Sequence, residues 1–257
     1  MAAASPAPSF MKQLAANEKS VRDRAVDSLR IYLRSRKEFS EIELLKLWKG
    51  LFYCMWMSDK PRNQQQLARD LADLVDVVPR ETVVPFLDAF WKTMAREWNG
   101  ISSLRMDKYL YLVRQYLYVS IRYLAKAGWK DSDMIDRFMK ILTDTPLNAR
   151  EARIPNGMRY HVLDVYLDEV EKVDNEYDAK TPFNRLLAPV VLIQKESPTR
   201  TVRERAKEQL DDERVRTWLG QGEKHAGEVK KDEDKPQGEQ KEDACLGEGE
   251  DWGGFED

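Results

Sequence analysis

Helical periodicity constrains this chain more than any other feature of its sequence. Apolar residues recur three and four positions apart in segment after segment, as on one face of an α-helix. In residues 20–36, Val21, Ala25, Leu29 and Leu33 fall on one side. The same spacing predicts helices over 20–36, 40–57, 67–78, 83–98, 103–127, 132–143, 156–173, 182–194 and 199–210. No segment shows the alternation of a half-buried strand, so the expected fold class is all-α.

Two segments at opposite ends of the helical region repeat one pattern. Residues 21–29 read V-R-D-R-A-V-D-S-L, and residues 202–210 read V-R-E-R-A-K-E-Q-L. The pattern resembles the second helix of a HEAT-type repeat, whose small and apolar positions face the neighbouring helix while arginine and acidic side chains face outward. Helical repeats stack because one helix pair cannot bury its apolar face alone. We predict a HEAT-like helical stack, a curved α-solenoid, over residues 1–219, with an irregular helical bundle as the alternative.

The charge of the chain is divided between a basic body and an acidic end. The formal net charge is −3, yet 13 of the 45 acidic residues and only 5 of the 42 basic residues lie from Gly220 onward. That segment has few apolar residues before Trp252, so burial cannot offset the entropy of ordering it. We predict a disordered acidic tail over residues 220–257. A mildly basic body suits partners that carry phosphates or acidic surfaces.

The last eight residues, E-D-W-G-G-F-E-D, place Trp252 and Phe255 among acidic side chains. Isolated aromatic residues in such surroundings often form a short docking motif, in which charge steers the encounter and the ring anchors it. We predict that Trp252 and Phe255 insert into a basic-rimmed apolar groove of a partner. The alternative is a tail without a docking role.

Residue types that carry most enzyme chemistry are scarce. The two cysteines, Cys54 and Cys245, fit neither a disulfide framework nor a zinc site, which favours a reducing compartment. His161 lies on a predicted helix without a metal-binding companion and is expected to be structural, and His225 lies in the polar tail. The sequence contains no glycine-rich phosphate loop or nucleophile motif, and no apolar run approaches the roughly 20 residues that cross a bilayer. We expect no catalytic residue, metal, cofactor or membrane contact.

The predicted helix 103–127 carries the clearest candidate surface for partner contact. Apolar residues cover about half of its girth, as in an inner helix of a stack. The remaining arc interleaves cations with tyrosines, and its candidate contact residues are Lys108, Tyr111, Arg114, Tyr118, Arg122 and Lys126. This combination suits phosphate contact and base stacking, and it suits a protein interface equally well. A solvated helix face is the third alternative.

Four further segments are similar to motifs of one known family, and they occur in the same order as in that family. They are residues 47–61 (LWKGLFYCMWMSDKP, continuing through 64–67), 105–114 (RMDKYLYLVR), 157–169 (GMRYHVLDVYLDE) and 181–189 (TPFNRLLAP). With these segments the sequence resembles the eukaryotic ribosomal-RNA-processing protein one family, nucleolar factors of large-subunit maturation. The stretch W-K-G-L-F-Y-C-M-W is too unusual for a generic helix, and the chain length is similar to that of compact, fungal-type members.

The resemblance implies a HEAT-like fold without enzyme activity, a location in the nucleus and nucleolus, and a role in pre-60S particles. Expected partners are other large-subunit assembly factors and pre-rRNA, and self-association is not expected. The family motifs are largely apolar, so we expect most of their residues to pack in the core. Within them we expect only Lys60, Arg62, Lys108 and Arg114 to be exposed. We expect a scaffold for assembly factors and pre-rRNA. The alternatives are a protein whose main affinity is for pre-rRNA, and a nuclease, for which the sequence offers no clustered carboxylates or histidines.

Overall fold

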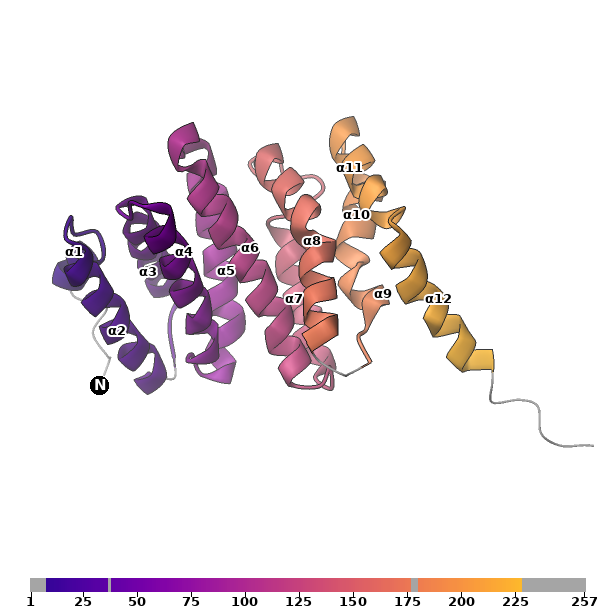
Figure 1. Cartoon of the computed structure of the whole chain (residues 1–257), viewed down its shortest axis with the longest axis horizontal. Coiled ribbons are helices and arrows are strands. Elements are labelled where there is room, and N and C mark those ends of the chain that lie inside the picture. Colours follow the sequence, from indigo (N-terminus) through magenta and orange to yellow (C-terminus); the bar gives the residue numbers. More distant parts are fainter. Residues whose placement is uncertain (1–7, 37, 177–179, 228–257) are drawn as a thin grey trace, which may run out of the picture.

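The computed structural model describes residues 8–36, 38–176 and 180–227, and most of that part is helical (Figure 1). The elements are α1 (Pro8–Leu14), α2 (Lys19–Ser35), α3 (Glu41–Trp56), α4 (Pro61–Ala72), η1 (Asp73–Asp76), α5 (Arg80–Glu97), η2 (Trp98–Gly100), α6 (Ser103–Lys126), α7 (Ser132–Asp144), α8 (Asn156–Glu176), α9 (Phe183–Leu186), α10 (Ala188–Glu196), α11 (Arg200–Leu210) and α12 (Glu213–Gly227). The described residues contain no strand, which confirms the predicted all-α class.

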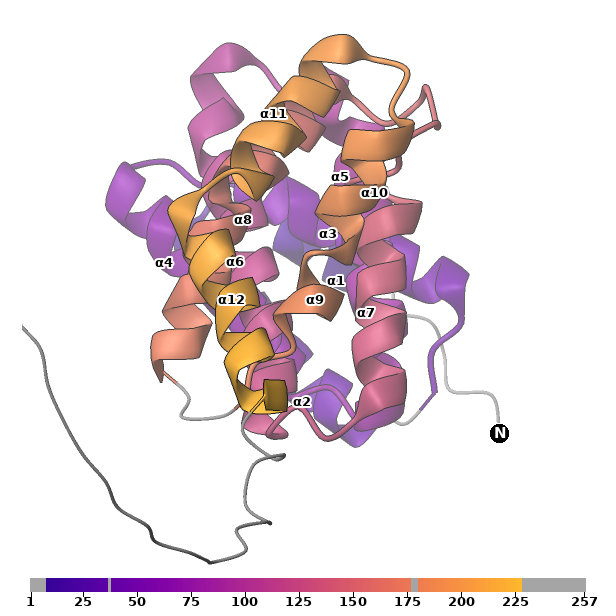
Figure 2. The ribbon, with the colours of Figure 1, turned by 90° about the vertical axis from the view of Figure 1, so that its right-hand side faces the viewer.

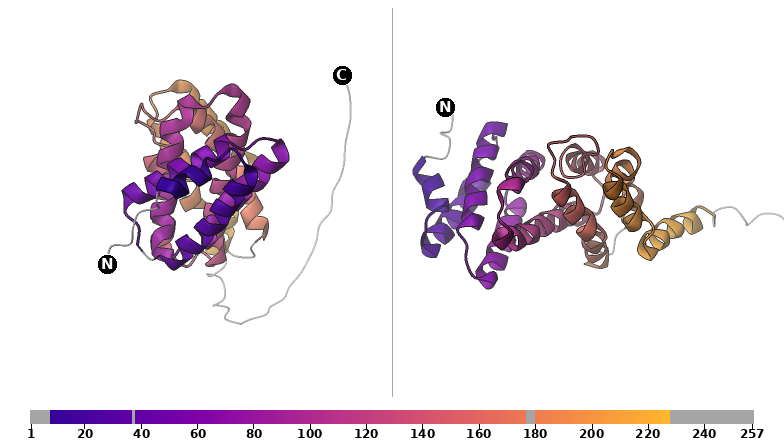
Figure 3. Two further views of the ribbon diagram at one scale, coloured as in Figure 1. Left: turned by 90° about the vertical axis from the view of Figure 1, so that its left-hand side faces the viewer. Right: turned by 90° about the horizontal axis from the view of Figure 1, so that it is seen from above.

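Consecutive helices form pairs, and the pairs stack into two rows. The first row contains α1, α3, α5, α7 and α10, and the second contains α2, α4, α6, α8 and α11. A view along the stack separates α4, α6 and α8 from α3, α5 and α7 (Figure 2). The view from above shows the helices following one another in chain order along the stack, from the indigo N-terminal end to the yellow C-terminal end (Figure 3). This arrangement confirms the predicted α-solenoid.

Local sequence determines where several helices begin and end. Ser40 and Glu43 form a capping box at the start of α3: the Ser40 hydroxyl accepts from the Glu43 N–H at 3.3 Å, and the Glu43 carboxylate accepts from the Ser40 N–H at 2.9 Å. Pro61 occupies the first position of α4, and Asp131 caps the first turn of α7. Helix α6 ends where Gly128 adopts a φ of 66°, a conformation that glycine adopts without strain.

An aromatic cluster fills the core between α3, α5 and α6. The Trp48 Nε1–H donates to the Phe86 carbonyl oxygen at 2.9 Å, and Trp48 is only 1% exposed. Its ring lies 4.9 Å from that of Phe90, which in turn stacks on Tyr116 at 3.9 Å between ring centroids. The Tyr116 hydroxyl donates to the Leu71 carbonyl oxygen of α4. The apolar part of the W-K-G-L-F-Y-C-M-W stretch therefore packs in the core, as its composition predicts.

The repeated V-R-[D/E]-R-A pattern points its two arginines in different directions. The alanine of each copy is buried in α2 or α11, as expected. The first arginine, Arg22 or Arg203, turns back and donates to two carbonyl oxygens of the loop before its helix. The second, Arg24 or Arg205, lies on the exposed face. The prediction of outward-facing arginines is wrong for Arg22 and Arg203, because carbonyls without a helical partner attract a guanidinium.

Helix α12 closes the described part of the chain. It packs on the short helix α9, where the rings of Phe183 and Trp218 stack at 4.6 Å between centroids. The expected domain boundary at Gly220 falls inside α12, which continues to Gly227. Residues 228–257, with Trp252 and Phe255, lie outside the described residues, so the predicted tail and its docking motif stay predictions.

Candidate interaction surfaces

Lys108 is buried rather than exposed. It retains 5% of its accessible surface, and its Nζ donates to the carbonyl oxygens of Trp56 at 2.7 Å and Ser58 at 2.9 Å. Burial lowers the pKa of Lys108 to about 8. The ammonium group lies at the C-terminal end of α3, where the helix dipole is negative and the last carbonyls lack helical partners. The expectation that Lys108 is exposed is wrong, because those carbonyls draw it inward.

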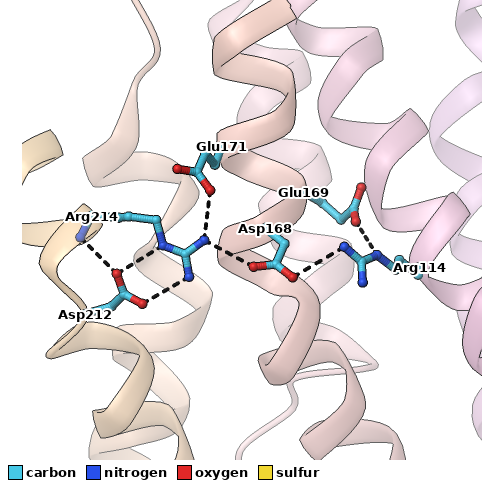
Figure 4. A network of polar contacts seen from close by, with 6 residues as sticks. All are labelled: Arg114, Asp168, Glu169, Glu171, Asp212 and Arg214. Atoms are coloured by element: carbon cyan, nitrogen blue, oxygen red, sulfur yellow. Dashed lines mark hydrogen bonds and ion pairs between the residues drawn. The ribbon is translucent and has the colours of Figure 1, made fainter.

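Arg114 pairs with two acidic residues of the neighbouring helix α8. Its Nε donates to Glu169, and its Nη2 lies 3.3 Å from the Asp168 carboxylate (Figure 4). Glu169 is only 2% exposed and one of its carboxylate oxygens has no hydrogen-bond partner in the described part. Burial raises the pKa of Glu169, and the Arg114 guanidinium opposes that rise. Arg114 therefore neutralises a carboxylate buried between α6 and α8.

The same network continues to α12. Arg214 lies 3.1 Å from Asp168, 3.0 Å from Glu171 and 3.0 Å from Asp212, and Figure 4 shows its guanidinium between the three carboxylates. Hydrogen bonds, first of all to Asp212, raise the pKa of Arg214. Asp168 is shared by Arg114 and Arg214. The shared carboxylate joins α6, α8 and α12 in one network.

Tyr111 and Tyr118 also contact neighbouring helices. The Tyr111 hydroxyl accepts from Arg69 of α4 at 3.0 Å. The Tyr118 hydroxyl donates to Glu176 of α8 at 2.7 Å, and the Lys172 ammonium lies 3.6 Å from the centre of its ring. Burial and the bond to Glu176 raise the pKa of Tyr118 to about 12. Both tyrosines therefore act between helices.

Arg122 and Lys126 pair with the acidic turn η1. Arg122 Nη2 lies 2.6 Å from Asp76 and 3.4 Å from Asp73, and Lys126 Nζ lies 3.0 Å from Asp76. The Arg122 side chain is only 16% exposed. Its position between α6 and η1 leaves little surface for a partner.

The cation–tyrosine stripe of α6 therefore lies between α4, η1 and α8. Two further ion pairs extend these contacts along the second row: Arg30–Asp70 joins α2 to α4, and Arg205–Asp164 joins α11 to α8. We call these two ion pairs, together with the contacts of Tyr111, Arg114, Tyr118, Arg122, Lys126 and Arg214 described above, the second-row ladder. Partner binding by Tyr111, Arg114, Tyr118, Arg122 and Lys126 stays a prediction, and their contacts in the structure are internal. Sequence alone did not reveal this, because the partners on the neighbouring elements lie 42 to 58 residues away in the chain.

Lys60 and Arg62 are exposed as predicted, at the start of α4. Neither forms an ion pair with any residue in the described ranges. Lys60 has φ 64° and ψ 123°, a backbone conformation that favours glycine. Its carbonyl oxygen accepts from the N–H groups of Asn63 at 3.0 Å and Gln64 at 3.1 Å, which holds this turn in place.

A second exposed group, which the helical pattern did not predict, lies on α3 and at the start of α6. Leu104, in the first turn of α6, is 95% exposed, and Tyr53 of α3 is 38% exposed. The Arg105 guanidinium lies 4.5 Å from the ring centre of the half-buried Trp56. We define the α3–α6 corner as Lys49, Tyr53, Trp56, Lys60, Leu104 and Arg105. Tyr53 and Trp56 belong to the W-K-G-L-F-Y-C-M-W stretch, which was predicted to pack in the core. The unusual number of aromatic residues in this stretch could have indicated that some of them lie at the surface.

His161 and Cys54 both lie inside the fold. The described residues contain no group of three or more His, Cys, Asp or Glu side chains that could hold a metal ion. The His161 ring Nε2 bonds the Leu110 carbonyl oxygen at 2.8 Å, and burial lowers the pKa of His161. Cys54 is fully buried, and burial raises the pKa of its thiol to about 12. His161 therefore has an internal hydrogen-bond partner, as expected of a structural histidine, and Cys54 is a core residue.

A cavity of about 270 Å³ lies between the α7–α8 loop and the start of α11. Arg159 contributes to its lining, but its guanidinium donates only to oxygens of residues 148–156. The arginine therefore orders the loop around it. Within the described ranges, no helix combines the length and the apolar character needed to cross a membrane.

Comparison with known proteins identifies relatives that match about two thirds of this chain. Human ribosomal RNA processing protein 1 homolog B (Homo sapiens) is 46% identical over 170 residues, covering 64% of this chain and 22% of that protein. The mouse homolog A (Mus musculus) is 42% identical over 174 residues, covering 65% of this chain and 35% of that protein. The homolog of Drosophila melanogaster is 33% identical over 193 residues, covering 71% and 27%. The chain thus spans 22% to 35% of the length of these curated relatives.

The family description that matches the sequence is "Nucleolar protein, Nop52", over residues 5–255. The match covers the complete helical stack and includes the four segments on which the resemblance rested. It confirms both the resemblance and the expected nuclear and nucleolar location. The chain belongs to the Nop52 family of nucleolar proteins.

Proposed function

We propose that this chain is a non-enzymatic assembly factor that holds other assembly factors and pre-rRNA during maturation of the large ribosomal subunit. A role in ribosome biogenesis is supported by the family, whose relatives are named for ribosomal RNA processing. Our proposal extends this role in three respects: the large subunit, the scaffolding role and the individual partners.

The second-row ladder is the observation that supports a scaffold best. Its ion pairs join α2 to α4, η1 to α6, α6 to α8, and α8 to α11 and α12, and a hydrogen bond from Arg69 to Tyr111 joins α4 to α6. Pairs that are partly buried and share partners hold neighbouring helices in one arrangement better than isolated surface pairs do. A helical platform of fixed shape can hold several partners in a defined geometry.

Affinity purification of the full chain from cells tests this proposal. A tagged chain should recover precursors of the large-subunit rRNAs together with other assembly factors. Recovery of small-subunit precursors alone, or of the chain by itself, would contradict it. Purified chain incubated with pre-rRNA and magnesium should leave the RNA intact, and specific cleavage would point instead to an enzyme.

Direct RNA binding is the alternative, and Lys60 and Arg62 are the cations that favour it. Both are exposed and lack an ion-pair partner among the residues described. Charge reversal of Arg114, Arg122 and Lys126 is unsuitable as a test, because it would place carboxylates against Glu169, Asp73 and Asp76 and disturb the fold.

The double variant Lys60→Glu/Arg62→Glu is a cleaner test of RNA contact. If RNA dominates affinity, this variant should weaken binding to pre-rRNA and reduce the salt dependence of the binding constant. The matched control is Lys207→Glu on α11, an exposed cation outside the ladder. Unchanged crosslinking and an unchanged salt slope in the double variant would count against Lys60 and Arg62 as RNA contacts.

A further inference from the structure

The most exposed large apolar side chain of the described residues lies at the α3–α6 corner. Leu104 is 95% exposed, and Tyr53 is 38% exposed. Arg105, the next residue after Leu104, lies over the Trp56 ring, so the start of α6 and the end of α3 share this corner. The other exposed large apolar side chains lie elsewhere: Ile31 on α2, Ile42 at the opposite end of α3, Leu192 on α10 and Leu219 on α12. An exposed leucine beside two aromatic residues suits a docking surface.

Cations without ion-pair partners surround this apolar surface. In the described ranges, no carboxylate lies within ion-pair distance of the nearby cations Lys49, Lys60, Arg62 and Arg105. The acidic neighbours in the sequence are Asp59 and Asp107, so the rim keeps a positive balance. The second-row ladder differs, because its cations are already paired. The corner therefore favours an occupant that carries negative charge around an apolar anchor.

The turn that carries Lys60 is held in place before any partner binds. Ser58 accepts from Lys108 Nζ at 2.9 Å and from Gln64 Nε2 at 3.0 Å through its carbonyl oxygen. These bonds fix the backbone on both sides of Lys60, which has a positive φ. A surface that is already ordered loses less entropy when it binds a ligand.

Residues 250–257 of the same chain have the matching chemistry. They contain Trp252 and Phe255 among Glu250, Asp251, Glu256 and Asp257. Roughly 25 residues separate Gly227 from Trp252, and at about 3.5 Å per residue they reach on the order of 80 Å. Helix α6 is a few helix spacings from α12, on the order of 30 Å at about 10 Å per spacing. The segment is therefore long enough to reach the corner.

We propose that the α3–α6 corner is the docking surface for residues 250–257 of the same chain. Trp252 and Phe255 cover Leu104, Tyr53 and Trp56, and the acidic residues face the cationic rim. Attachment to the same chain raises the effective concentration of the segment, so a weak contact is occupied. The docking requires neither pre-rRNA nor an assembly factor, although it uses Lys60 and Arg62, the same cations that the alternative of direct RNA binding would use.

Peptide binding to the full chain tests the proposal. The receptor is the full chain with Trp252→Ala/Phe255→Ala, and the probe is a fluorescein-labelled peptide of residues 246–257, followed by anisotropy. The peptide should bind this receptor, and it should bind the unaltered chain about fivefold more weakly because the tethered segment competes. Leu104→Ser/Arg105→Glu in the receptor should weaken binding about tenfold. Equal affinity for the receptor and the unaltered chain would overturn the proposal.

The matched control is Leu192→Ser/Lys195→Glu on α10, which alters another exposed leucine and a nearby exposed lysine. This control should leave peptide binding unchanged, and a loss as large as that of the corner variant would overturn the proposal. Circular dichroism of both variants should match the unaltered chain, since Leu104 is almost fully exposed. Sedimentation gives a further check: a dimer that disappears with Trp252→Ala/Phe255→Ala would place the segment on a second copy and overturn docking within one chain.

Discussion

Arg22 and Arg203 make the same contact at opposite ends of the stack. Arg22 Nη1 donates to the carbonyl oxygens six and five residues earlier, both at 2.7 Å. Arg203 Nη1 donates to the carbonyl oxygens six and five residues earlier, at 2.7 and 3.0 Å. Each arginine thus connects the second helix of a pair to the loop that precedes it. The repeated sequence pattern therefore encodes a repeated hydrogen-bond arrangement as well as a repeated apolar face.

Arg22→Leu should destabilise the protein by about 2 kcal/mol, because it removes two charge-assisted hydrogen bonds and leaves two loop carbonyls without this donor. Arg22 is 6% exposed, so water replaces those bonds poorly. The measurement is urea denaturation followed by circular dichroism. Arg24→Leu is the control: its side chain is exposed, and the change should stay within about 0.5 kcal/mol. Equal effects of the two substitutions would contradict a special role for Arg22.

Periodicity predicted most of the fold because helices of a stack bury one or two faces, and apolar spacing records those faces directly. It failed for the short helix α1 and for the whole of α12, where the apolar signal is weak. Periodicity also could not show which polar side chains meet across helices. Arg114 and Glu169 lie 55 positions apart, and only the packing of α6 on α8 brings them together.

The candidate site was harder to predict for the same reason. On a helical wheel, Lys108 and Lys60 are both cations near a helix start. The structure buries Lys108 against the carbonyls of Trp56 and Ser58 and leaves Lys60 exposed. A wheel assigns a side chain to one face of its own helix, but the neighbouring helices decide whether that face meets solvent.

Trp48→Phe should lower the free energy of unfolding by about 2–4 kcal/mol. The substitution removes the hydrogen bond to Phe86 and leaves space beside Phe90 and Tyr116, because the phenyl ring is smaller than the indole. Chemical denaturation of the two proteins gives the difference. Tyr53→Phe in the same helix should change stability by less than about 0.5 kcal/mol, since Tyr53 is 38% exposed. A stability loss confined to Tyr53→Phe would be inconsistent with this core.

Arg114→Met should destabilise the protein near pH 7 by about 2 kcal/mol, because it leaves Glu169 buried without its cation. The pKa of Glu169 is already raised by burial, and loss of Arg114 should raise it further. A raised pKa in the folded state means that the folded protein binds the extra proton, so the variant should regain stability as the pH falls toward about 5. Thermal unfolding at several pH values measures this recovery.

The double variant Arg114→Met/Glu169→Met checks the cause of that loss. It removes both charges from the interface of α6 and α8, so it should be more stable near pH 7 than Arg114→Met alone. Its stability should also lack the recovery at low pH, because no carboxyl remains at position 169. A double variant as unstable as the single one would show that the Arg114 side chain acts through packing instead.

Lys108 should make stability rise with pH in the alkaline range. Burial lowers the pKa of Lys108 to about 8 in the folded protein, whereas an unfolded lysine titrates near about 10.4. Between these values the unfolded state binds more protons than the folded state, so the free energy of unfolding increases with pH. Position 108 cannot titrate in the Lys108→Met variant. The free energy of unfolding of the unaltered protein, measured relative to this variant, should therefore increase by about 2 kcal/mol between about pH 7 and 10. Urea denaturation of both proteins across this range measures the difference, in which the titration of Cys54 and the tyrosines cancels. A constant difference would mean that Lys108 keeps an ordinary pKa in the fold.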